Sequence, residues 1–267
     1  MIDTHVHFWE LSRGYYDWIT KERLKLCRDF TPGDFVDVIE NTDVESCLAV
    51  QAAPMEAETD LLLSYAKKFS YIKGVIGWTD LSSRSLSTSL DYFKDHSAVK
   101  GIRPMAGVQS GPEWLGSDYD AGIEALSKNN LILEALALPK HLSAITSIAQ
   151  KYPSLVIVIN HAAKPAPNDW AYWSKRILEF SNLENVFCKL SGLTAQSLDI
   201  GHYQVIFDTL LDVFGPSRLI WGSDYPVLLE TSEYVSWLKV TQYLLERLTF
   251  NEKRQITTIT AKQVYKL

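Results

Sequence analysis

Eight short apolar runs alternate with helix-patterned segments, and this alternation restricts the fold more than any other feature of the sequence. Some runs, such as Leu155–Ile159, are apolar without interruption, which is typical of strands that are covered on both faces. The predicted strands are 2–8, 46–52, 72–80, 99–105, 131–137, 155–161, 186–192 and 219–225. The predicted helices between them are 56–69, 85–94, 119–128, 141–151, 173–181, 202–214 and 231–248.

Eight strands that alternate with helices predict an α/β protein, a single-domain (β/α)8 TIM barrel. An open, doubly wound sheet is the alternative, but no Gly-x-Gly-x-x-Gly motif follows any predicted strand, so its commonest ligand signature is missing. No linker, repeat or low-complexity tract divides the 267 residues. We therefore expect one domain over residues 1–267.

The charge of the chain and its cysteine content indicate what it binds and in which compartment it lies. The formal net charge is −6, and no run of Lys and Arg exceeds two residues, which argues against nucleic-acid and anionic-membrane partners. No apolar stretch approaches the roughly 18 residues of a transmembrane helix. The 3 cysteines lack metal-site spacing and fit a reducing compartment. We expect a cytoplasmic protein that acts on a small molecule, and the sequence leaves a homo-oligomer open.

In a barrel, the catalytic groups lie at the C-terminal ends of the strands and on the loops that follow. The polar residues that end the predicted strands are therefore the informative ones. They are His5, His7, Gln51, Asp80, Arg103, Glu134, His161, Lys189, Ser191 and Asp224. The loops 9–18, 106–118 and 162–173 are long and rich in aromatic residues, so they are predicted to cover a small polar substrate.

Two of these residues, His5 and His7, stand two positions apart on the first strand. Residues i and i+2 of a strand face the same side, so both imidazoles are predicted to project into the mouth of the barrel. Asp224 ends the last strand, which neighbours the first when the barrel closes, and His161 ends the sixth. Two imidazoles and a carboxylate are suitable ligands for a divalent ion such as Zn²⁺.

Five segments carry a resemblance to a known family. They are IDTHVHFW (2–9), GIRP (101–104), INHAAKP (159–165), CKLSG (188–192) and GSDYPV (222–227). In this order and spacing they resemble the amidohydrolase superfamily. More narrowly, they resemble its amidohydrolase-2 branch of sugar-lactone hydrolases (fucono-, rhamnono- and galactono-lactonases) and pyrone-dicarboxylate lactonase. The resemblance extends from Ile2 to Tyr265 and implies a barrel of the metal-dependent hydrolase type.

The resemblance implies a hydrolase that opens a sugar-acid lactone by attack of water on the ester carbonyl. It makes Asp224 the general base and His161 the group that polarises the carbonyl. It also makes Arg103 a substrate-binding residue, for which an ion pair with Glu134 is the structural alternative. The other candidate substrate contacts are Gln51, Glu134 and Lys189. Lys164 is, like Lys189, a plausible contact to a hydroxyl or carboxylate, for which a solvated charge at the rim is the structural alternative.

The implied metal site departs from the family pattern. Metal-dependent members place a histidine at the end of the fifth strand, where this chain has Glu134. A binuclear site would need a bridging lysine or glutamate on the fourth strand, where this chain has Arg103. One divalent ion, most simply Zn²⁺, would then be held by His5, His7 and Asp224, with Glu134 as an optional ligand. Catalysis without a metal is the other interpretation.

Other functions are weighed against this one. A metal-dependent nonoxidative decarboxylase of the same superfamily is the alternative, although the fifth-strand histidine of that branch is missing here. A barrel that binds a small polyol without catalysis is a third interpretation, which the joint presence of His5, His7, His161 and Asp224 argues against. A serine hydrolase is not indicated, because no serine lies in a Gly-x-Ser-x-Gly motif.

Overall fold

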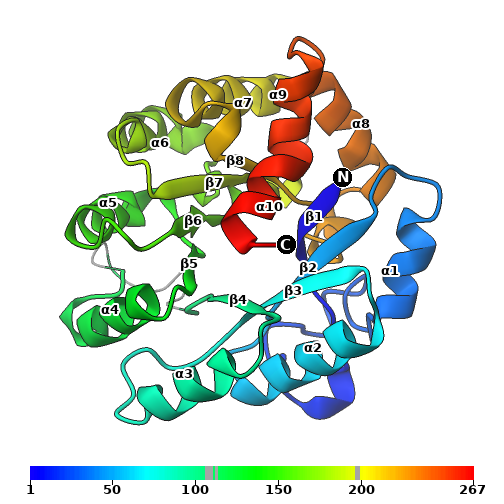
Figure 1. Cartoon of the computed structure of the whole chain (residues 1–267). Coiled ribbons are helices and arrows are strands. Elements are labelled where there is room, and N and C mark those ends of the chain that lie inside the picture. The colour runs from blue at the N-terminus through cyan, green and yellow to red at the C-terminus, as the bar shows by residue number, and fades with distance from the viewer. Residues whose placement is uncertain (106–110, 112–113, 196–198) are drawn as a thin grey trace.

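The computed structural model describes residues 1–105, 111, 114–195 and 199–267. Eight parallel strands follow one another in chain order around one sheet. The ring is completed between Val6 and Tyr225, next to a 2.7 Å hydrogen bond from the His7 amide to the Tyr225 carbonyl. Helices surround the sheet (Figure 1), which confirms the predicted (β/α)8 barrel. The strands are β1 (Ile2–Val6), β2 (Ser46–Val50), β3 (Ile72–Gly77), β4 (Val99–Ile102), β5 (Ile132–Ala135), β6 (Ile157–Ile159), β7 (Val186–Leu190) and β8 (Leu219–Trp221).

The helices lie outside the barrel wall, except that the C-terminal helix crosses one end of the barrel (Figure 1). None of the helices in the described ranges is both long enough and apolar enough to cross a bilayer. The α-helices are α1 (Pro32–Ile39), α2 (Glu56–Lys68), α3 (Leu86–Lys94), α4 (Asp120–Lys128), α5 (Leu142–Lys151), α6 (Trp170–Ile177), α7 (Ile200–Phe214), α8 (Tyr234–Leu245), α9 (Phe250–Arg254) and α10 (Thr260–Tyr265).

The structure contains two helical regions that the pattern of apolar runs does not predict, α1 and the segment of α9 and α10. Helix α1 begins at a capping box. The Thr31 hydroxyl accepts from the Asp34 amide, the Asp34 carboxylate accepts from the Thr31 amide, and Pro32 occupies the first turn. These local signals stabilise the start of a short helix that buries Phe35 and Ile39, four residues apart. The strands end earlier than the predicted runs, for example β2 at Val50 against the predicted 52 and β5 at Ala135 against the predicted 137.

The end of the barrel where the strands begin is closed by α10. Ile2, at the start of β1, belongs to a buried apolar cluster that includes Val264 and Tyr265 of α10. The Tyr265 hydroxyl donates a hydrogen bond to Glu134 inside the barrel. Because α10 fills this end, a small molecule enters the barrel from the carboxyl ends of the strands.

Candidate active site

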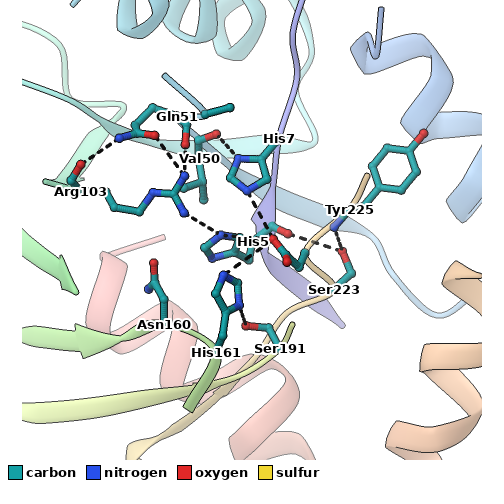
Figure 2. A network of polar contacts seen from close by, with 12 residues as sticks. His5, His7, Val50, Gln51, Arg103, Asn160, His161, Ser191, Ser223 and Tyr225 are labelled. Carbon is teal, nitrogen blue, oxygen red and sulfur yellow. Dashed lines mark hydrogen bonds and ion pairs between the residues drawn. The ribbon is translucent and has the colours of Figure 1, made fainter. Parts of the chain in front are cut away.

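A local irregularity of β1 accompanies the inward orientation of His5, and His7 follows the last residue of the strand. The register between β1 and β2 shifts between Asp3 and Val6, so Ile2 and His5 both face the interior although they are three residues apart. The imidazole rings of His5 and His7 lie 4.9 Å apart in an edge-to-face arrangement. The two rings therefore share one face of the strand, as the alternation of side chains predicts (Figure 2).

Asp224 follows β8 and is tied to β1. Its φ is +69°, and this left-handed conformation costs a non-glycine residue about 1–2 kcal/mol. Its amide donates to the His5 carbonyl at 2.9 Å. Its Oδ1 atom lies 3.4 Å from His7 Nε2, 3.7 Å from His5 Nε2 and 3.8 Å from His161 Nε2. One carboxylate oxygen therefore faces three imidazoles that come from β1 and from the end of β6.

His161 begins a left-handed turn of four non-glycine residues. The φ angles of His161, Ala162, Ala163 and Lys164 are 54°, 52°, 60° and 53°. The Trp173 indole donates to the Ala162 carbonyl at 2.7 Å and holds the turn against α6. Backbone strain of this kind concentrates at functional sites. Here it brings both His161 and Lys164 to the lining of one cavity.

Gly192 makes room for the His161 ring. Its φ is +63°, and a Cβ atom at this position would lie 2.5 Å from His161 Nδ1. Gly192→Ala is expected to displace the imidazole and to lower the turnover rate about 10- to 100-fold in a steady-state assay. Gly14→Ala is the matched control, because Gly14 also has a left-handed backbone, with φ 71° and ψ 23°, but its Cβ would meet nothing within 4 Å. Equal losses of activity in the two variants would contradict the prediction.

Burial sets the charge states of these groups. It lowers the pKa of His161 to about 3 and brings the pKa of His5 well below its ordinary value, so both imidazoles are neutral at pH 7. Burial alone would raise the pKa of Asp224, but the imidazoles of His161 and His7 outweigh it and leave this pKa below its ordinary value. The site therefore presents an ionised carboxylate beside neutral imidazoles.

Arg103, at the end of β4, is oriented by Gln51. Its Nη2 donates to the Gln51 carbonyl and, at 3.0 Å, to Gln51 Oε1. The Gln51 amide group donates back to the Arg103 carbonyl at 2.8 Å. Arg103 Nη1 lies 3.2 Å from His5 Nε2 (Figure 2). Gln51 does not line the cavity, so its geometry supports positioning of Arg103 and not the predicted substrate contact.

Glu134 and Lys189 lie deeper in the barrel than the sequence predicts. Both side chains are fully buried, and they form an ion pair at 2.9 Å. Glu134 also accepts hydrogen bonds from Tyr265 and Asn160. The ion pair weighed as the alternative for Arg103 is absent from the described residues, where Lys189 is the partner of Glu134. Neither residue lines the cavity, so the geometry supports neither a substrate contact of the pair nor Glu134 as a metal ligand.

A cavity of about 280 Å³ opens at the carboxyl ends of the strands, lined by Asp224, His7, His161 and Arg103. Trp18, from the predicted aromatic loop 9–18, also lines it. Much of the predicted loop 106–118 lies outside the described residues, since 106–110 and 112–113 are not among them. Lys164, a plausible contact from the sequence, also lines the cavity, and Arg23 lines it without having been predicted. Lys164 carries a signal in the sequence, because it follows His161 by three residues, whereas Arg23 ends no strand.

The donor atoms of the site fit a divalent metal ion. Because a carbonyl only accepts, the Nδ1 atom of His7 carries the proton that is shared with Val50 O at 2.8 Å. When His7 Nε2 carries no proton, its lone pair faces the Asp224 carboxylate at 3.4 Å, and a metal ion bound near these two acceptors would be stabilised by both. His5, His161 and Asp224 offer ligand atoms that all lie within 4.8 Å of one another. The structure thus adds His161 to the predicted set of candidate ligands.

Comparisons with known proteins give a consistent result. A family model described as Amidohydrolase matches residues 2–267. The L-fucono-1,5-lactonase of Burkholderia ambifaria is 32% identical over 92% of this chain and 88% of that protein. The L-fucono-1,5-lactonase of Burkholderia multivorans is 28% identical over 100% of this chain and 96% of that protein. The crystal structure of an amidohydrolase from Burkholderia multivorans with bound zinc has a TM-score of 0.93 at 28% identity and covers 100% of this chain and 99% of its own.

Proposed function

This chain belongs to the amidohydrolase family, and from that premise we propose that it is a hydrolase that opens a sugar-acid lactone to the hydroxy acid. The observation that carries the proposal is the convergence of one carboxylate oxygen of Asp224 on three imidazoles, in a cavity that Arg103 also lines. The names of the two curated relatives support an aldonolactone of the fuconolactone kind as the substrate.

The residues of the cavity can carry the reaction in two steps. Asp224 accepts a proton from the attacking water while the new C–O bond forms at the lactone carbonyl carbon. Arg103 stabilises the carbonyl oxygen, which gains the electron pair. When the bond to the ring oxygen breaks, Asp224 returns the proton to that oxygen. The product is an open-chain hydroxy acid, whose carboxyl group releases one proton at neutral pH.

His5, His161 and Asp224 would hold one zinc ion, with His7 beside them, and the zinc in the similar solved structure supports this assignment. Bound there, the ion would lower the pKa of a water molecule toward about 7 and polarise the carbonyl. Ser191 Oγ lies 2.9 Å from His161 Nδ1. When this hydroxyl accepts the Nδ1 proton, Nε2 of His161 is free as a ligand atom. When it donates instead, Nε2–H of His161 can polarise the carbonyl directly.

Proton release from a panel of fucono-, rhamnono-, galactono- and gluconolactones near neutral pH tests the proposed reaction. We expect at least one lactone to acidify the medium faster than its spontaneous hydrolysis, with the opened acid identified by mass spectrometry. If no lactone of the panel is hydrolysed faster than it is spontaneously, an aldonolactone substrate is refuted. Release of CO₂ from aromatic carboxylates would then establish the decarboxylase alternative, which is less supported because the curated relatives are lactonases and no histidine lies on β5.

Removal of the metal is expected to lower the turnover rate by about 100-fold or more, because a bound ion supplies several kcal/mol of stabilisation to the developing charge. Elemental analysis before and after chelation measures the metal per chain, and added zinc should restore the rate. Full activity in a preparation without detectable metal would contradict the prediction and would favour His161 as the group that polarises the carbonyl.

The remaining predictions concern the domain organisation, the partners and the cellular location of the enzyme. We infer one domain over residues 1–267, a small-molecule substrate, no nucleic-acid or membrane partner, and a cytoplasmic location. The net charge of −6 and the sparse cysteines support this assignment. The oligomeric state is left open.

A further inference from the structure

Lys164 is a cation of the cavity that is attracted to the Asp224 carboxylate but does not contact it. The half-buried side chain lines the cavity together with Asp224 and His161. Within the described parts of the chain, its ammonium group makes no hydrogen bond and no ion pair. A partly desolvated ammonium group has lost some of its hydration, and an anionic ligand would supply acceptors for its three donors.

The other cations around the site are engaged by the protein. Arg103 is held by Gln51, and Lys189 pairs with Glu134. Arg23 lines the cavity but pairs with Glu230 at 3.2 Å. Arg103 nevertheless keeps one donor unused, because its buried Nε–H has no acceptor in the described part of the molecule. Among the described lining residues, Arg103 and Lys164 thus face one carboxylate, that of Asp224, while the neutral imidazoles add no negative charge. The charges of these lining residues therefore sum to a positive value.

The backbone of Lys164 has a left-handed conformation, which costs free energy in a residue other than glycine. Lys164 ends the left-handed turn with φ 53° and ψ 55°, a conformation that glycine adopts without penalty and lysine does not. The Trp173 indole fixes the turn through the Ala162 carbonyl. Strain that the surrounding structure maintains is characteristic of ligand-binding positions, and here it places an ammonium group beside the reacting groups.

We propose that Lys164 binds the carboxylate of open-chain sugar acids in this cavity, so that the enzyme recognises its product by charge. The identity of the ligand as a product rests on the proposed function, whereas the binding of a hydroxy-acid anion does not. A neutral lactone lacks this charge, so the ammonium group discriminates the opened acid from the closed ester. The hydroxy acid then acts as a competitive inhibitor of lactone hydrolysis.

Calorimetric binding of gluconate and glucitol tests the proposal, because the two polyols differ only by a carboxylate in place of a hydroxymethyl group. The purified protein is expected to bind gluconate at least about 10-fold more tightly than glucitol, since a hydrogen bond to a charged group contributes this much. Lys164→Met should lose about 10-fold or more in gluconate affinity and leave glucitol binding unchanged. Lys164→Arg should retain most of the preference. Lys175→Met, which removes an exposed lysine of α6, should behave as wild type.

Equal gluconate affinity in wild type and Lys164→Met, with unchanged circular dichroism and metal content, would overturn the proposal. So would a wild-type protein that binds gluconate and glucitol equally well. Should Lys164→Met fail to fold, the same comparison is made with Lys164→Gln. The protein could hydrolyse no lactone and still bind gluconate more tightly than glucitol through Lys164. That result would refute the proposed reaction but support the carboxylate site.

Discussion

Asp224→Asn is expected to lower kcat at least about 100-fold while the protein remains folded, because the amide keeps the shape of the carboxylate but accepts no proton from water. Asp224 is the one carboxylate that lines the cavity among the described residues, so no neighbour there can replace it. Steady-state rates on the best lactone of the panel measure the loss, and circular dichroism and thermal melting verify the fold.

The control for this variant is Asp169→Asn. Asp169 lies in the short helix Pro167–Asp169 of the loop after β6, is exposed and does not line the cavity, so its substitution should leave kcat close to wild type. The metal content of Asp224→Asn separates loss of the base from loss of a metal ligand. A rate above about one tenth of wild type would show that Asp224 is not the base.

Glu134→Leu is expected to destabilise the protein by about 3–5 kcal/mol, because it leaves the charge of Lys189 buried without a partner. The ion pair is fully buried on both sides, and the substitution also removes the acceptor of the Tyr265 hydroxyl. For a chain of this size the loss corresponds to a decrease in Tm of roughly 10 °C. Thermal unfolding followed by circular dichroism measures it.

The double variant Glu134→Leu with Lys189→Met should recover most of that stability, since two apolar side chains of similar volume can replace a buried ion pair at little cost. Asp120→Ala is the surface control. It removes the exposed partner of Lys151, a 2.7 Å pair, and exposed pairs contribute little to stability, so its Tm should stay near wild type. A double variant as unstable as Glu134→Leu alone would mean that the uncompensated charge is not the cause.

Prediction from the sequence succeeds where local rules apply. Continuous apolar runs identify the strands because both faces of a parallel barrel are covered. The two-residue period places His5 and His7 on one face, and the chain order places Asp224 next to them where β8 meets β1. The same rules locate α2 to within a residue, Glu56–Lys68 against the predicted 56–69. They miss α1, which is only 8 residues long, so that its apolar face is little more than Phe35 and Ile39 and the capping box at Thr31 is its clearest signal.

Local rules do not predict pairs across the barrel interior. Gln51, Glu134 and Lys189 end predicted strands as Arg103 does, and the position of a residue at a strand end does not by itself tell which of the four meets a substrate. In the structure Gln51 orients Arg103, while Glu134 and Lys189 neutralise each other below the cavity. The depth of a side chain in the barrel depends on the tilt and stagger of the strands, and no single strand encodes either quantity.

The sequence by itself determined the barrel, the inward pair His5 and His7, and the meeting of Asp224 with that pair, because periodicity and strand order are properties of the chain alone. Only the tertiary structure decided which charges are compensated. It pairs Lys189 with Glu134, adds His161 to the candidate metal ligands, and leaves Lys164 facing the cavity without a hydrogen bond or ion pair in the described residues. The physical reason is that these contacts are made between residues far apart in the chain, which come close to one another only when the barrel closes.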